Sequence, residues 1–505
     1  MFFIRPTATS LAFSALLGTS LLTGCPTGTD EPTPEADPQP DVDPGEAPET
    51  YTFDSRFDDG TSISYSGQVN RHALIRGLKS YIGGIDDDTF TAGTSADDVK
   101  AALRYFTDYK NQGGDGSDDV PYSLTDASGN DVDTVQLTFG DIGSPASLEE
   151  KLPDVDADFG TAGWSDGYGV IGYGDGTQTP SAVLDAMLTE LATLVAARAD
   201  GTYETDPAGA DLEVAFLSGN GVDHQQLIQK FLDGAVTYSQ AADDYLDDDV
   251  DGKGLLSDNT VAVEKDGSTK SYTALEHVWD EGFGYFGAAR DYDAYTDDEI
   301  AAKGGRDAYA GGFFDSDDDG AIDLKSEINQ GHSVNAAKRD RGTSGAGATD
   351  YTQQAFDAFV AGRHLIATGE DLDADELAEL TQHRDDAMDA WERAIAATVV
   401  HYINDVLRDM GTFGTDEYSF ADHAKHWSEA KGFALSLQFN PRAALSRAQL
   451  TELHDHLGDA PVLPSADAAD IEAYAADLNA AKTLLKDAYD FHVDNMGDEA
   501  GQNGW

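Results

Sequence analysis

Basic residues are scarce in this sequence. Its 31 lysines and arginines stand against 95 aspartates and glutamates, which gives a formal net charge of −64. Nucleic acids and anionic lipid surfaces are bound through lysine and arginine, so the composition argues against both as partners. Cations are the natural partners of such a chain, although an acidic surface that only keeps a protein solvated in salty surroundings has the same composition.

Cysteine and long hydrophobic runs are also nearly absent. Cys25 is the only cysteine, so no disulfide can form within the chain, and burial, helix packing or bound ions must stabilise it. The apolar stretch of residues 11–22 is shorter than the roughly 20 residues that cross a membrane, and we expect no later segment to reach that length. The stretch follows Arg5 and ends in the tetrapeptide LTGC, residues 22–25, which is the pattern of a bacterial lipoprotein signal.

This pattern divides the chain into a signal peptide (residues 1–24), an acidic, proline-rich tether that we expect to be disordered (residues 25–50) and a folded part. Acylation of Cys25 would anchor the protein to the membrane by lipid. Pro26 follows, and no aspartate stands there to retain the lipoprotein at the inner membrane. We therefore expect an outer-membrane lipoprotein of the bacterial cell envelope, on the periplasmic face or at the cell surface.

The folded part is predicted to be all-α. Helical periodicity recurs between loops rich in glycine and aspartate, and the longest periodic run extends from Asp373 to Met410. Strand signals are limited to short pieces such as TVQLTFGDI, residues 134–142. About 455 residues are enough for two or three domain-sized cores. We expect two helical-bundle lobes, residues 51–345 and 346–505, with long loops between the helices.

A calcium-type loop is predicted in FFDSDDDGAIDLKSE, residues 313–327. Its acidic positions follow the spacing by which alternate carboxylates converge on one hard cation, and a glycine permits the sharp turn between them. The twelfth position holds serine where a glutamate is usual, but a glutamate follows immediately. The expected ligands are Asp315, Asp317, Asp319, Asp323 and Glu327.

The stretch LDDDVDGKGLLSDN, residues 246–259, is a poorer copy of this loop. Asp247, Asp249 and Asp251 keep the initial spacing and are the expected ligands. Gly254 and Leu255 replace the packing and ninth-position residues of the loop. In so acidic a chain, this spacing also arises from composition alone.

A candidate transition-metal site lies in EHVWDEGFGYFG, residues 276–287. His277 precedes Asp280 by three positions and Glu281 by four, so the three side chains share one face of a helix. A histidine and a carboxylate in this arrangement can offer nitrogen and oxygen ligands to iron or another divalent transition metal. Three glycines in the same stretch disfavour an exposed helix, by about 1 kcal/mol each relative to alanine, so we expect another helix backbone to approach closely there.

A related pattern follows in HWSEAKGFALSLQF, residues 426–439. His426 and Glu429 repeat the spacing of three, and a Gly-Phe pair follows within a turn, as it does in the first stretch. The recurrence suggests two related helical halves, each with one histidine-acid helix that binds metal. The alternative is that both histidines are hydrogen-bonded core residues beside the neighbouring aromatic side chains.

Several long stretches together resemble a family of uncharacterised bacterial lipoproteins related to the imelysins. Besides the lipoprotein signal and the acidic tether, they are YTFDSRFDDGTSISYSGQVNRHALIRGLKSYI, EHVWDEGFGYFG, DLKSEINQGHSVNAAKRD and HWSEAKGFALSLQFNP. The resemblance extends over nearly all of residues 51–497. It implies a two-lobed helical envelope protein that is associated with iron uptake.

Imelysins carry a G-x-H-x-x-E helix that is proposed to bind metal, and the resemblance places His277 at its histidine and Asp280 at its acid. This chain departs from the pattern because Leu275 replaces the glycine and aspartate replaces the glutamate. Some imelysins are classed as metallopeptidases. In this chain Glu281 would be the only local base for that chemistry, and no H-E-x-x-H helix is present.

Three functions follow as hypotheses. The first is a non-enzymatic, lipid-anchored envelope protein that binds metal and is linked to iron acquisition, with His277, Asp280, Glu281, His426 and Glu429 as ligands. The second is a metallopeptidase of the imelysin type. The third is a calcium-stabilised surface protein that binds another envelope protein and uses its histidines only for packing.

Overall fold

The computed structural model describes residues 47–109, 122–126, 128–143, 147–154, 169–368 and 371–505. Residues 47–505 form one compact unit. The predicted signal peptide (residues 1–24), the predicted acylation site Cys25 and most of the predicted tether (residues 25–50) lie outside the described residues.

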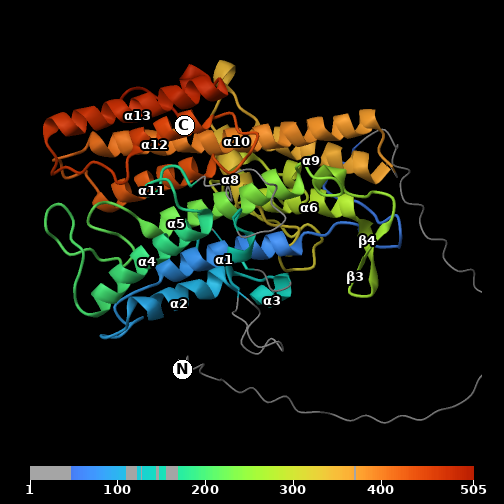
Figure 1. Ribbon diagram of the computed structural model, residues 1–505, viewed down its shortest axis with the longest axis horizontal. Coiled ribbons are helices and arrows are strands. Elements are labelled where there is room, and N and C mark those ends of the chain that lie inside the picture. The colour runs from blue at the N-terminus through green and yellow to red at the C-terminus, as the bar shows by residue number, and fades with distance from the viewer. Residues whose placement is uncertain (1–46, 110–121, 127, 144–146, 155–168, 369–370) are drawn as a thin grey trace, which may run out of the picture. The chain divides into compact units, whose positions relative to one another are not determined.

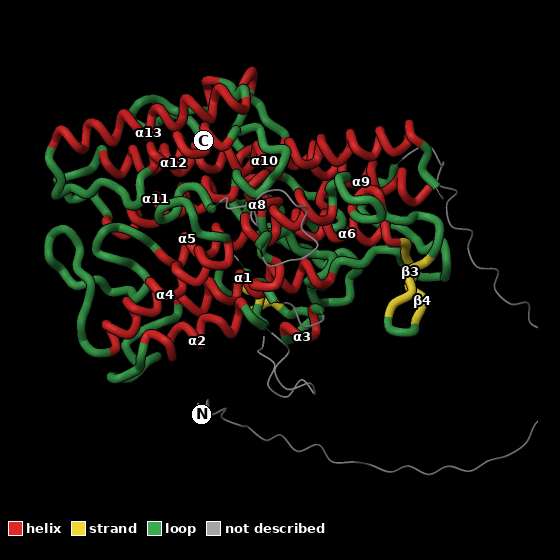
Figure 2. The backbone as a smooth tube through the Cα atoms, viewed as in Figure 1, coloured by secondary structure: helices red, strands yellow, loops and turns green. Residues whose placement is uncertain are grey.

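Helices make up most of the described chain, which confirms the expected all-α class (Figures 1 and 2). The α-helices in the first part are α1 (Ser66–Gly83), α2 (Ala96–Thr107), α3 (Phe139–Ile142), α4 (Pro180–Ala199), α5 (His224–Leu232), α6 (Ala274–Phe286) and α7 (Asp297–Ile300). They are followed by α8 (His332–Asp340), α9 (Tyr351–Thr368), α10 (Ala374–Met410), α11 (Phe420–Ser436), α12 (Arg447–Leu457) and α13 (Ala468–Tyr489).

Strands in the described residues form only two antiparallel pairs. They are β1 (Leu124–Thr125) with β2 (Asp131–Val132), and β3 (Ala262–Lys265) with β4 (Ser268–Thr273).

The strand signal at residues 134–142 is wrong, because its second half forms the short helix α3. Thr138 begins this helix: its hydroxyl accepts a hydrogen bond from the backbone N–H of Asp141. The Asp141 carboxylate accepts one from the backbone N–H of Thr138 in return. This reciprocal cap stabilises a helical turn where the alternating apolar pattern predicted a strand.

The longest predicted helix is confirmed as α10. Asp373 caps it by accepting from the backbone N–H groups of Asp375 and Glu376, while the Glu376 side chain accepts from the Asp373 backbone N–H. Capping satisfies backbone donors that have no partner within the helix. The buried face of α10 packs against α9, α11 and α13, so this helix organises much of the fold.

The helical stretch over residues 224–246 is irregular. Helix α5 ends at Leu232 and is followed by two π-helical segments, η2 (Asp233–Tyr238) and η3 (Ala241–Tyr245). A π turn takes in an extra residue, which rotates the following side chains relative to a regular α-helix, and such segments often occur at functional sites. The first of them starts beside the cavity described below.

Close packing accounts for the glycines of α6. A Cβ atom at Gly282 would lie 2.8 Å from the Leu246 side chain, and one at Gly284 would lie 2.8 Å from the Tyr65 side chain. Gly287 ends the helix in the left-handed conformation, with a φ angle of 86°. Side chains, and not the helix backbone that we expected, make the close approach.

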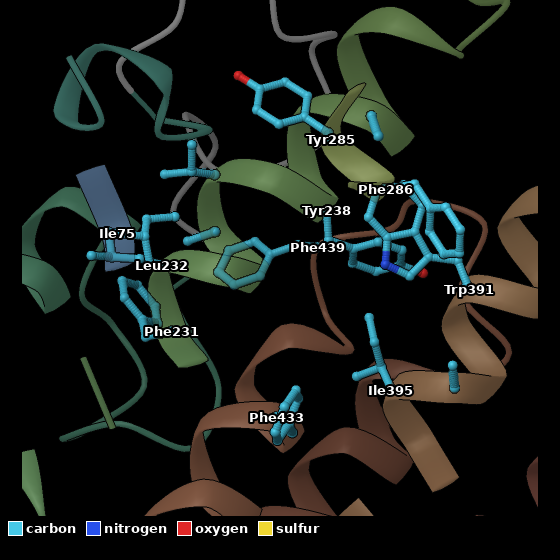
Figure 3. Close-up of a cluster of buried hydrophobic side chains, with 14 of the residues drawn as sticks. Ile75, Phe231, Leu232, Tyr238, Tyr285, Phe286, Trp391, Ile395, Phe433 and Phe439 are labelled. Carbon is cyan, nitrogen blue, oxygen red and sulfur yellow. The ribbon is translucent and has the colours of Figure 1, made fainter. Parts of the chain in front are cut away.

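One large hydrophobic core joins most of the described helices, and a second, small cluster contains Leu212, Leu217, Phe420 and Ala424. Figure 3 shows part of the large core, formed by Phe231 and Leu232 of α5, Phe286 of α6, Trp391 and Ile395 of α10 and Phe433 of α11. The rings of Phe286 and Trp391 meet edge to face, with their centroids 5.2 Å apart. Because α5 packs against α11 and α6 packs against α9, helices from both predicted lobes share this core. The division into lobes at residue 345 stays a prediction.

Helix α4 is the one described helix that is long and apolar enough to cross a membrane by length and composition. This differs from the expectation that no segment after the signal would reach that length. Within the fold, 44 % of this segment is buried, and it packs against α2 and α5. A core helix passes the same test of length and composition, and packing accounts for the apolar character of α4.

Candidate functional site

The structure separates the ligands of the first predicted transition-metal site. His277 stacks on the ring of Tyr272 with centroids 4.5 Å apart, and its Nδ1 lies 2.9 Å from the Ser64 carbonyl oxygen. Its Nε2 lies 3.8 Å from Glu281 Oε1. His277 and Glu281 are therefore neighbours on one helix face, as their spacing predicts, whereas Asp280 faces the interior.

Asp280 belongs to a buried ion pair. Its Oδ1 accepts hydrogen bonds from the Tyr51 hydroxyl at 2.8 Å and from Arg363 Nε at 2.9 Å, and its Oδ2 accepts from the Ser64 backbone N–H at 3.0 Å. Both Asp280 and Arg363 are completely buried. A carboxylate with these three donors has the partners that a buried charge needs, so its geometry points to a structural role.

The second predicted pair also diverges. His426 Nδ1 lies 2.8 Å from Asp409 Oδ2, and its Nε2 lies 3.9 Å from Asp405 Oδ2, both on α10. Glu429 is only 4 % exposed and faces Lys230, with Nζ and Oε1 3.9 Å apart. Asp405 and Asp409 were not among the predicted ligands, although their spacing of four places both on one face of α10.

The first predicted calcium loop brings three carboxylates together. Within the described chain, Asp315, Asp317 and Glu327 form the only group of at least three metal-ligating side chains whose donor atoms all lie within 4.8 Å of one another. Glu327 Oε1 also accepts from the backbone and hydroxyl of Ser316 at 2.7 Å. The glutamate just beyond the twelfth position thus joins the loop, as predicted.

Two further predicted ligands of this loop lie outside the group of three. Asp319 is exposed, and its Oδ1 accepts from the backbone N–H of Ala321. Asp323 Oδ1 accepts from Gln136 at 2.9 Å and its Oδ2 accepts from Ser326 at 3.1 Å. Only three of the five predicted carboxylates therefore meet.

The second predicted calcium loop has no such group of three among the described side chains. Asp247 is buried, whereas Asp249 and Asp251 are exposed. Burial raises the pKa of Asp247, and so does a hydrogen bond with Asp249. The chain turns at Gly254 into a short 3-10 helix that lies against Asp247. This helix stands where the second half of a calcium loop would be.

A large cavity lies where five helices meet. Its volume is about 1170 Å³, and side chains of α1, α5, α8, α10 and α11 form most of its wall. Figure 1 shows these helices gathered around the middle of the fold, with α5 packed between α1 and α11. Eight lysines and arginines line it: Arg76, Lys79, Lys230, Lys303, Lys338, Arg339, Arg341 and Lys425. They make up about a quarter of the chain's 31 basic residues.

Helix geometry turns these cations toward one another. Arg76 and Lys79 lie on one face of α1, because residues three apart are neighbours on a helix surface. Lys230 occupies the facing side of α5, and Lys338 and Arg339 come from the last turn of α8. The cavity therefore collects positive charge from three separate parts of the sequence.

Few of these cations have a carboxylate partner. Lys230 lies 3.9 Å from Glu429, and Arg341 lies 2.7 Å from Asp298. For the other six, no carboxylate of the described residues lies within 4 Å. Arg76 instead donates to the Gln330 side chain at 2.8 Å. Unpaired lysines and arginines are unexpected in a chain with three acids for each base.

The pKa values in the cavity reflect burial and, after it, the proximity of like charges. Burial, followed by repulsion from Lys230, lowers the pKa of Lys79 to about 7 and that of Lys338 to about 8. Burial lowers the pKa of Arg339 to about 10. Strongly perturbed pKa values in a cleft are typical of functional sites, and an anion in this cavity would relieve the perturbation.

The comparisons with known proteins identify one segment. A family described as "Domain of unknown function (DUF4856)" matches residues 183–311, which include most of α4, all of α5 to α7 and the π-helical segments. No curated protein and no solved structure matches the chain. The match neither names an activity nor identifies the chain as imelysin-related, so that resemblance stays a prediction. About a quarter of this chain is thus similar to a domain family of unknown function.

Proposed function

We propose that this protein binds a multiply charged anion in the cavity between α1, α5, α8, α10 and α11 and is not an enzyme. The observation that carries the proposal is the set of eight lysines and arginines around one cavity in a chain of formal charge −64. Most of these cations have no carboxylate partner among the described residues. The fold therefore concentrates positive charge at one place although its composition opposes it.

Electrostatics supports this proposal. Burial and, after it, the neighbouring charge of Lys230 disfavour the charged form of Lys79, which lowers its pKa in the empty cavity. Hydrogen bonds from charged donors contribute about 1.5–3 kcal/mol each. An anion that accepts from several of these groups would recover the free energy that the empty cavity loses.

The functions expected from the sequence remain proposals. Lipid anchoring through Cys25 in the outer membrane and a link to iron acquisition are compatible with anion binding. Metal binding through His277 and His426 has weaker support, because neither histidine shares a group of three ligands with its predicted partners among the described residues. The same geometry disfavours the metallopeptidase, which needs an open metal site beside Glu281.

Titration with pyrophosphate at low salt tests anion binding. Pyrophosphate is expected to bind the wild-type protein, and the double variant Lys79→Met, Lys338→Met is expected to bind at least about 100-fold more weakly. The reason is that two charged contacts disappear, each worth about 1.5–3 kcal/mol, while 1.4 kcal/mol corresponds to a factor of ten in affinity. Isothermal titration calorimetry measures the difference.

The matched control is Lys265→Met, Lys270→Met on the β3–β4 hairpin. It changes the net charge by the same amount at a place outside the cavity, so it should leave the affinity within about twofold. Equal losses in both double variants, or no binding to the wild type, would contradict the proposal.

A second function is favoured by the group of Asp315, Asp317 and Glu327, which suits a calcium-stabilised surface protein that binds another envelope protein. Chelation of calcium is expected to lower the melting temperature by several degrees, because a ligand at 100 times its Kd stabilises a fold by about 2.7 kcal/mol. The variant Asp315→Asn, Asp317→Asn should lose this response, whereas Asp318→Asn, an exposed neighbour outside the group, should keep it. Differential scanning calorimetry with and without EGTA measures the change in melting temperature. If EGTA lowers the melting temperature of the double variant as much as that of the wild type, this calcium site is excluded.

A further inference from the structure

The cavity is larger and chemically more varied than a simple inorganic anion requires. Its volume of about 1170 Å³ slightly exceeds the range of roughly 300–1,000 Å³ that is usual for ligands of drug size. The wall also contains carboxylates, amides and aromatic rings among the cations. Each of these groups restricts the class of ligand.

Two buried carboxylates face the cavity together with the cations. Asp233 is 6 % exposed and Glu429 is 4 % exposed, and both belong to its lining. Glu429 Oε2 is buried and has no hydrogen-bond partner. Carboxylates accept hydrogen bonds, so a ligand that matches the whole wall brings hydrogen-bond donors such as hydroxyl groups in addition to its negative charge.

Amide and guanidinium side chains are also part of the wall. Asn329 Nδ2 and Arg339 Nε are buried donors without a hydrogen-bond partner, and both residues line the cavity. Buried polar groups without a partner are rare in native folds and need an explanation, such as a missing ligand or water. The other amide side chains of the wall are Gln226, Gln229, Gln330 and Asn335.

Aromatic rings form one end of the cavity. Tyr81, Phe106, Tyr122 and Phe139 line it there, and Phe139 lies edge to face with Tyr122 and with Phe106, at centroid distances of 5.8 and 6.3 Å. Gly77 permits this arrangement, since a Cβ at that position would lie 2.8 Å from the Phe139 ring. Phe106 and Phe139 are buried, whereas Tyr81 and Tyr122 are partly exposed and can offer apolar ring surface to the C–H face of a saturated ring.

We infer that the ligand is an anionic oligosaccharide, a chain of several sugar rings that carries carboxylate or sulfate groups. This inference rests on the proposed anion binding and names the ligand class of the same cavity. The acidic groups of the sugar contact Lys79, Lys338 and Arg339, and its hydroxyls donate to Asp233 and Glu429. The amides bridge further hydroxyls, and one sugar ring packs on the aromatic end.

Calorimetric titration of the full chain with four probes tests the inference. The probes are tetragalacturonate, which carries only carboxylates, a carrageenan tetrasaccharide that carries only sulfate esters, neutral maltotetraose and pyrophosphate. At least one acidic tetrasaccharide is expected to bind 100-fold or more tightly than maltotetraose and more tightly than pyrophosphate. The pair of acidic probes shows whether carboxylate or sulfate is the preferred group.

The variant Tyr81→Ala separates ring packing from charge. It is expected to lower the affinity for the preferred tetrasaccharide at least tenfold. The affinity for pyrophosphate should stay within twofold, because pyrophosphate has no ring to pack. Tyr203→Ala, a partly exposed tyrosine that is not part of the cavity wall, is the matched control and should change neither affinity.

The outcomes distinguish the two proposals. If pyrophosphate binds and both acidic tetrasaccharides bind no better than maltotetraose, the carbohydrate inference is overturned and anion binding stands. Tighter binding of adenosine monophosphate than of either acidic tetrasaccharide would overturn it in favour of a nucleotide. If no anion binds at all, both proposals fail.

Discussion

Replacement of Arg363 by alanine is expected to lower the free energy of unfolding by about 3–5 kcal/mol, the range for breaking a buried ion pair. The guanidinium is completely buried and donates from Nε to Asp280 at 2.9 Å, from Nη1 to Glu276 at 3.3 Å and from Nη2 to the Ser62 hydroxyl at 2.6 Å. Its removal leaves the fully buried Asp280 without this partner, while Glu276 keeps only Arg56, whose Nε lies 3.7 Å from Glu276 Oε1. Denaturant titration followed by circular dichroism measures the loss.

The exposed ion pair between Arg341 and Asp298 provides the control. Its two side chains are 40 % and 53 % exposed, so Arg341→Ala should change stability by no more than about 1 kcal/mol. Similar losses in the two variants would show that the Arg363 cluster does not hold the structure together. A large loss at Arg363 alone would explain why Asp280 faces inward and away from His277.

The second large effect is an increase in stability. Replacement of Lys79 by methionine is expected to stabilise the ligand-free protein at pH 7 while it weakens anion binding. The pKa of Lys79 falls to about 7 in the fold from an ordinary value of 10.5. Between these two pH values the unfolded chain binds more protons than the native protein, so the stability of the empty wild type rises with pH.

The sign of the effect follows from this difference. The penalty for the charged lysine is fully present below about pH 7 and disappears as the pH approaches 10.5. One pKa unit corresponds to about 1.4 kcal/mol; because water still reaches part of the side chain, we expect Lys79→Met to gain on the order of 2 kcal/mol at pH 7 and little at pH 10. The variant should therefore show a flatter profile of stability against pH than the wild type.

Melting temperatures at pH 7 and pH 9, with Lys265→Met as the control, test this expectation. Pyrophosphate should stabilise the wild type more at pH 7 than at pH 9, since binding favours the protonated lysine. A Lys79→Met protein that is less stable than the wild type at both pH values would show that the ammonium contributes favourably to the empty fold.

Local patterns predicted the fold class well. The start of α10 follows from its cap at Asp373 and its length follows from a periodic apolar face. Both signals come from residues that are close in the sequence, so they can be read without the fold. The group of three carboxylates in the predicted calcium loop could also be found from the sequence, because Asp315, Asp317 and Glu327 lie within thirteen positions of one another. The strand prediction for residues 134–142 was wrong because the capping box of Thr138 and Asp141 stabilises a helical turn despite the alternating apolar residues.

Contacts between distant residues were not predictable from spacing. Helical periodicity places Asp280 beside His277, but Arg363, 83 positions later, decides which way the carboxylate faces. Glu429 meets Lys230 in the same way, from another helix. The cavity combines Lys79, Lys230 and Lys338 from three helices, and no local pattern relates them. Basic residues are scarce in this sequence, so composition alone does not predict that eight of them line one cavity.

If the cavity binds an anion as proposed, the contrast between the acidic chain and its basic cavity would also govern how quickly that anion enters. An anion that diffuses toward a molecule of formal charge −64 first meets repulsion, which at physiological ionic strength acts over about 8 Å. Added salt would screen this long-range repulsion more than it screens the contacts between the anion and the buried cations of the cavity. Entry would therefore be faster in brine than in fresh water, the reverse of proteins whose surface charge attracts what they bind.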